Sequence, residues 1–183
     1  MKMHKTFLSA LAVTVAITLV GCSGSSTKAP DVTASLRTSL DQAGLKDVSA
    51  SQDREKAVVT LGGHVAMDAD KTQAEFIAKS IAGNQVVANQ IAVIPPGAES
   101  EAKAINSDLD KGIEHNLSAA LTQENLKDSV KFQVKNHVVT LSGKVDSQSR
   151  RAHASDVAAA IPNVEQVVNE LEVKGQKATS TNE

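Results

Sequence analysis

The strongest constraint on this chain is an internal repeat. Residues 57–93 align with residues 137–173 without a gap after a shift of 80 positions, and 12 of the 37 aligned positions are identical. The identical positions are mostly valine, leucine, isoleucine, alanine and glycine, which is what shared packing produces. No acid, base or cysteine recurs among them. The repeat therefore predicts two similar small domains and gives little information about chemistry.

Apolar spacing predicts the same order of elements in both copies: helix, strand, strand, helix, strand. Val32, Leu36 and Leu40 recur at a spacing of four, as on one face of a helix. Residues 130–134 alternate apolar and polar side chains, as in a half-buried strand. The short turn between the first two strands makes them antiparallel, whereas a strand–helix–strand unit places its strands parallel. The expected fold class is α+β, with each domain a three-stranded mixed sheet and two helices packed on one face.

Prolines, glycines and polar runs set the expected boundaries. They predict a signal peptide over 1–21, a flexible tether over 22–30, a first domain over 31–95, a partly helical linker over 96–106, a second domain over 107–174 and a disordered tail over 175–183.

The N-terminus has the features of an export signal. Lys2 and Lys5 precede an apolar run from Phe7 to Val20, which is shorter than the ~20 residues that span a bilayer. Residues 19–22 read LVGC and resemble the bacterial lipobox, in which cleavage leaves a cysteine that carries diacylglycerol. The resemblance implies a lipidated Cys22 at the mature N-terminus, and Ser23 is similar to the outer-membrane sorting pattern. The alternatives are an ordinary signal peptide or a membrane helix.

Two short motifs recur in register and carry a family resemblance. Residues 59–65 read VTLGGHV and 87–93 read VANQIAV; residues 139–145 read VTLSGKV and 167–173 read VVNELEV. Together with the element order, they resemble the BON domain, named for bacterial OsmY and nodulation proteins. Two copies behind a lipobox are similar to dual-BON outer-membrane lipoproteins. The resemblance implies a non-enzymatic, periplasm-facing protein that supports envelope integrity and osmotic stress tolerance, often through phospholipid contact.

Neither a catalytic site nor a cofactor is predicted. The five histidines show no HxxxH or HExxH spacing, and Cys22 is the only cysteine, so no metal site is expected. A GxSxG nucleophile motif is absent, and a hydrolase or transferase would need a polar cluster that the sequence does not show.

The repeated glycines and asparagines have structural explanations. Gly63 and Gly143 lie inside predicted strands, where glycine marks a bulge or the close approach of another backbone, here expected to be a helix lying across the sheet. Asn89 and Asn169 are expected to be buried and to satisfy a loop backbone, with ligand binding as the alternative.

One region has an uneven charge. From position 127 to 153 six basic residues face two acids, a net of +4; the basic residues are Lys127, Lys131, Lys135, Lys144, Arg150 and Arg151. Basic side chains near an anionic leaflet contribute about 1 kcal/mol each. We expect these residues to contact phospholipid headgroups, with an ordinary solvated surface as the alternative.

The remaining partner predictions follow from charge and from sheet edges. Without residues 1–21 the chain has 17 basic and 21 acidic residues, a net of −4, so no nucleic-acid partner is expected. A second interpretation is a scaffold whose exposed sheet edges dock an envelope protein.

Overall fold

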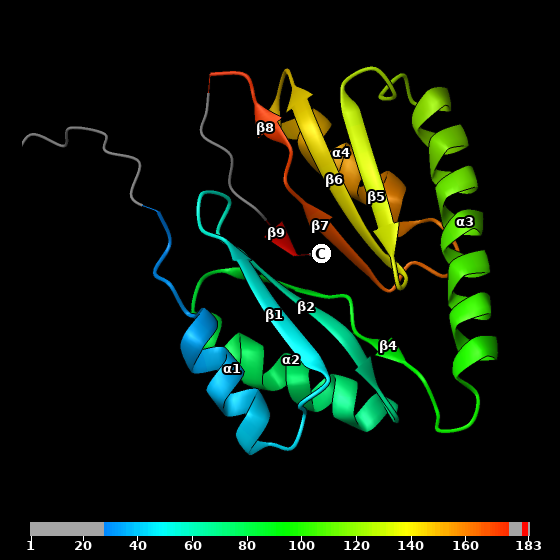
Figure 1. The fold of residues 1–183 in the computed structure, drawn as a ribbon. Coiled ribbons are helices and arrows are strands. Elements are labelled where there is room, and N and C mark those ends of the chain that lie inside the picture. Colours follow the sequence, from blue (N-terminus) through cyan, green and yellow to red (C-terminus); the bar gives the residue numbers. More distant parts are fainter. Residues whose placement is uncertain (1–27, 176–180, 183) are drawn as a thin grey trace, which may run out of the picture.

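The computed structural model describes residues 28–175 and 181–182, which form two domains with the same order of elements (Figure 1). The predicted signal peptide, Cys22 and most of the tether lie outside the described residues. The first domain consists of α1 (Thr33–Gln42), β1 (Val48–Asp53), β2 (Val58–Val65), α2 (Asp68–Ala82), β3 (Val86–Asn89) and β4 (Ala92–Val93). The second consists of α3 (Glu99–Gln123), β5 (Val130–Lys135), β6 (Val138–Val145), α4 (Gln148–Ala159), β7 (Gln166–Asn169), β8 (Glu172–Val173) and β9 (Thr181–Asn182).

The central strand of each sheet is the β-branched strand that carries the repeated glycine. β2 pairs antiparallel with β1 on one side and parallel with β3 and then β4 on the other. In the second domain β6 pairs in the same way with β5, β7 and β8. The predicted mixed sheets are therefore confirmed.

The third strand of each sheet is interrupted, whereas the sequence predicts one continuous strand over 86–94 and another over 164–173. In the first domain Gln90 and Ile91 separate β3 from β4. At the break the side-chain oxygen of Asn89 accepts the N–H of Ile91 at 3.4 Å. Asn169 does the same for Leu171 at 3.1 Å.

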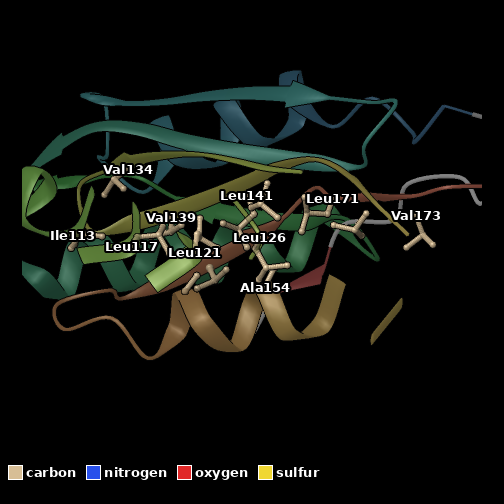
Figure 2. Packing of buried hydrophobic residues seen from close by; sticks show 14 residues of the cluster. Ile113, Leu117, Leu121, Leu126, Val134, Val139, Leu141, Ala154, Leu171 and Val173 are labelled. Atoms are coloured by element: carbon tan, nitrogen blue, oxygen red, sulfur yellow. The ribbon is translucent and has the colours of Figure 1, made fainter. Parts of the chain in front are cut away.

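Each domain has its own core between the sheet and its two helices, as predicted. Figure 2 shows the second core, where Leu117 and Leu121 of α3 lie against Leu141 of β6 and Ala154 of α4. In the first domain Leu36 and Leu40 of α1 are buried in the same way. Alanines on α2 and α4 let these helices lie close to the sheets.

Gly63 and Gly143 lie where another backbone comes very close. A Cβ on Gly63 would be 2.0 Å from the carbonyl oxygen of Asp47, and one on Gly143 would be 2.3 Å from that of Ser129. The prediction of a close approach is confirmed, but the approaching segment is the residue that enters the first strand, not a helix. The N–H of His64 bonds to Asp47 O at 3.3 Å, which continues the antiparallel register of β1 and β2 past Val48 and Gly63.

Two connecting segments contain regular secondary structure, which the sequence predicts for part of the first segment but not for the second. Residues 99–106 of the expected linker form the first turns of α3, whose first buried residue is Ile113. In the predicted disordered tail, Thr181–Asn182 form β9, which pairs antiparallel with β7. In the part of the chain that the structure describes, no helix combines the length and apolarity needed to cross a membrane.

Candidate functional site

The predicted basic surface is centred on β5. Lys131 and Lys135 are exposed on the face of β5 opposite Phe132, which packs on the core. Strand residues advance by about 3.3 Å each, so these two ammonium groups project about 13 Å apart along one line. Among residues 28–175 and 181–182, no ion pair or hydrogen bond engages the side chain of Lys127, Lys131 or Lys135. These three lysines are available to an anionic partner.

Two other predicted basic residues are paired within the second domain. Lys144 lies 3.1 Å from Glu172. Arg150 donates to the carbonyl of Asn125 at 2.9 Å and lies 3.9 Å from Asp146. Both remain partly exposed, but their charges are compensated locally.

Arg151 is not part of the surface. It is 8% exposed, and its guanidinium donates to the carbonyls of Leu171 at 3.0 Å and Asn169 at 2.9 Å. A buried guanidinium held by two carbonyls cannot meet a headgroup. The structure therefore removes Arg151 from the predicted lipid contact and makes it a residue that ties α4 to the interrupted third strand.

The buried asparagines belong to the same arrangement, and their structural explanation is confirmed. The amide nitrogen of Asn169 donates to the carbonyl of Arg151 at 2.9 Å and to the hydroxyl of Ser155. In the first domain Asn89 donates to the carbonyl of Lys71 and to Glu75 at 2.9 Å. Each asparagine thus joins the strand break to the helix that covers it.

The sequence prediction missed an apolar seam between the two domains. Its members lie on the sheet faces opposite the helices and are nearly inaccessible: Val58, Val86, Ala88, Val138 and Val168. A signal was present, because residues 86–88 are apolar at consecutive positions, and a strand with two apolar faces is covered on both.

Polar contacts cross the seam beside these apolar residues. Lys56 Nζ lies 2.6 Å from the carboxylate of Glu170, whose side chain is 12% exposed. The hydrogen bond to Glu170 raises the pKa of Lys56 despite partial burial. The side-chain amide of Gln166 lies against β3, accepting from the N–H of Asn89 at 2.9 Å and donating to the carbonyl of Val87 at 2.7 Å.

Glu165 joins both domains through one carboxylate. It lies 2.7 Å from Lys71 Nζ of the first domain and 3.0 Å from the Nδ1 of His137 in the second. Burial alone would raise the pKa of Glu165, but the hydrogen bonds from Lys71 and His137 outweigh it and hold that pKa below its usual value. The group is therefore ionised, and the contact intact, at neutral pH.

Acid should weaken this contact. A carboxylate with a lowered pKa stabilises docking above its usual pKa of 4.5, and the contribution is lost as the pH falls through the lower value. We expect Glu165→Gln to remove that acid dependence of domain docking, measured by small-angle X-ray scattering between about pH 6 and pH 3. The control is Glu124→Gln, because Glu124 pairs with His153 at 2.9 Å inside one domain. Identical profiles for the Glu165 variant and the unmodified chain would contradict the prediction.

Two hollows of about 320 and 160 Å³ lie along the seam on either side of the Lys71–Glu165 pair. The charges that line them are mostly matched: Lys79, for example, lies 2.5 Å from Glu75. In the described ranges no group of three His, Cys, Asp or Glu side chains could hold a metal ion.

Comparison with known proteins agrees with this architecture. The family model of the BON domain matches residues 29–95 and 109–175. Osmotically-inducible protein Y of Escherichia coli (strain K12) is 31% identical over 146 residues, which are 78% of this chain and 71% of that protein. Two solved structures of CdsD, a structural protein of the type III secretion system of Chlamydia trachomatis, give TM-scores of 0.32 and 0.35 at 13% and 12% identity. They cover 78% and 75% of this chain, which spans 65% and 90% of those chains. With two matched copies that together span most of its length, the chain belongs to the BON-domain family.

Proposed function

We propose that the chain is a non-enzymatic outer-membrane lipoprotein that faces the periplasm and supports envelope integrity under osmotic stress. The name of the Escherichia coli relative, osmotically-inducible protein Y, supports the link to osmotic stress. Residues 19–22, LVGC, support lipidation at Cys22. Several acyl chains on one cysteine would hold the protein firmly at the membrane surface.

The biochemical act that we propose is contact with anionic phospholipid through Lys127, Lys131 and Lys135. The observation that carries it is the contrast within the basic region: these three lysines have unpaired side chains among the described residues, while Lys144 and Arg150 have acidic neighbours. Each basic residue near an anionic surface contributes about 1 kcal/mol, so three give about a hundredfold preference for it.

Vesicle co-sedimentation of residues 23–183 tests this contact. Binding should require anionic lipid and weaken with salt, because exposed charges are screened. Reversal of both strand lysines, Lys131→Glu with Lys135→Glu, should lower binding by about tenfold or more. The matched control reverses two exposed charges of the first domain, Arg37→Glu with Lys46→Glu, and should bind almost as well as the unmodified protein. Equal binding by both variants would overturn the proposal; the anchor itself is tested by acyl mass on Cys22 of the mature protein.

A second candidate function is a scaffold that docks an envelope protein. The observation in its favour is that the outer edge of β7 accepts a strand, since β9 pairs with Val168 and Asn169. In addition, lysines on an outer strand such as β5 prevent edge-to-edge pairing, which would explain Lys131 and Lys135 without lipid. Docking should survive in detergent and yield one cross-linked protein, whereas lipid contact should not.

A further inference from the structure

The contacts across the seam are related by an approximate twofold axis. A shift of 80 positions converts Lys56 into Asn136 and Gln90 into Glu170. Lys56 bonds to Glu170, and the amide of Asn136 donates to the carbonyl of Gln90 at 2.8 Å. Each domain therefore contacts the other through equivalent positions of the repeat, which is the property of an isologous interface.

The apolar residues of the seam follow the same relation. Val58 and Val138 occupy equivalent positions in the two copies of the repeat, and so do Ala88 and Val168. All four belong to one buried cluster. The fifth member of the cluster, Val86, is equivalent to Gln166 in the second copy. Gln166 forms a hydrogen bond with the backbone of β3 across the seam. One self-complementary surface thus occurs on both domains.

Charge decides which domains pair. A contact between two first domains would place Lys56 against Gln90, and one between two second domains would place Asn136 against Glu170. Only a first domain with a second domain brings Lys56 to Glu170, at 2.6 Å. The shape of the surface has approximate twofold symmetry, but its charged residues favour the pairing of a first domain with a second domain.

We propose that this surface also joins two copies of the chain, with the first domain of each paired to the second domain of the other. The connection permits it: residues 95–97 are an exposed turn, and α3 has no buried residue before Ile113. The fourteen residues of α3 before Ile113, 99–112, extend about 21 Å. Because the linker gives an effective concentration near the millimolar range, the closed single chain dominates in dilute solution. The inference does not depend on lipid binding.

Mixing two charge variants tests it. Lys56→Glu alone places two carboxylates face to face across the seam, and Glu170→Lys alone places two ammonium groups there, so the first domain of each variant repels its own second domain. When one copy of each variant pairs with the other, the unmodified Lys56 of one chain meets the unmodified Glu170 of its partner, as in the native contact. The second contact joins the glutamate introduced at position 56 to the lysine introduced at position 170. We expect each variant alone to have the mass of one chain by light scattering, and the equimolar mixture to show twice that mass. The double variant in one chain should return to a closed monomer.

The matched control mixes Lys144→Glu with Glu172→Lys, which swap charges of an exposed pair inside the second domain, 3.1 Å apart. This mixture should stay at the mass of one chain. Dimers in the control mixture, dimers of either seam variant alone, or no dimer in the seam mixture would each overturn the proposal.

A second variant keeps the proposal testable if a charge reversal prevents folding, which circular dichroism would show. Deletion of Pro96 and Gly97 shortens the turn, so the second domain cannot fold back on the first and should pair with another chain. We expect a doubled mass, abolished by Ala88→Glu at the seam. A monomeric deletion variant, or a dimer that survives Ala88→Glu, would overturn the proposal.

Discussion

Gly63→Ala is expected to lower the free energy of unfolding of the first domain by about 3 kcal/mol or more. Gly63 has a φ of +89°, and an added Cβ would lie 2.0 Å from the carbonyl oxygen of Asp47. A left-handed conformation costs a residue with a side chain roughly 1–2 kcal/mol, and forced displacement of packed backbone costs about 1–3 kcal/mol more. Chemical denaturation, followed by circular dichroism, measures the loss.

Gly44→Ala is the matched control, because Gly44 has a φ of +80° but nothing within 4 Å of an added Cβ. This variant should lose only the roughly 1–2 kcal/mol of unfolding free energy that a side chain costs in the left-handed conformation. Gly143→Ala should resemble Gly63→Ala, since its Cβ would lie 2.3 Å from Ser129 O. Equal losses at Gly44 and Gly63 would show that the close approach of Asp47 is not what requires glycine.

Arg151→Met is the second large effect, with an expected loss of about 3 kcal/mol in the second domain. The substitution keeps the apolar stem but removes charged donors from the buried carbonyls of Asn169 and Leu171, and hydrogen bonds from charged groups contribute about 1.5–3 kcal/mol. Vesicle binding per folded molecule should not change, because the guanidinium is buried.

Arg150→Met is the control for this variant, since Arg150 precedes Arg151 but its side chain is 43% exposed, so water can replace its contacts. Its stability should change by about 0.5 kcal/mol or less. If Arg151→Met lost vesicle binding without losing stability, the assignment of Arg151 to the interior would be wrong.

Charge counting could not separate Arg151 from its neighbours, but helical periodicity could have done so. Arg151 lies on the same buried face of α4 as Ala154, Ser155 and Ala158. Composition alone treats all arginines alike, whereas a spacing of three and four places this one with the core. The same periodicity predicted the helices and the central strands correctly.

Features that depend on contacts between distant segments could not be predicted in this way. The approach of Asp47 to Gly63 depends on the pairing register of β1 with β2 and on the positive φ of Gly63, neither of which the strand pattern gives. β9 comes from a polar tail without alternation, so its pairing with β7 left no sequence signal. The seam required comparison of the two copies on their outer faces, where Ala88 and Val168 are both apolar.

Covalent fusion of two similar halves frees each half to vary alone. In an assembly of two identical chains, every substitution appears on both sides of the axis. Here Lys56 has no copy at position 136, and the exposed Phe76 of α2 corresponds to Asp156 of α4. One half can therefore acquire a new outer surface while the other keeps its own, as long as both retain the residues where they meet.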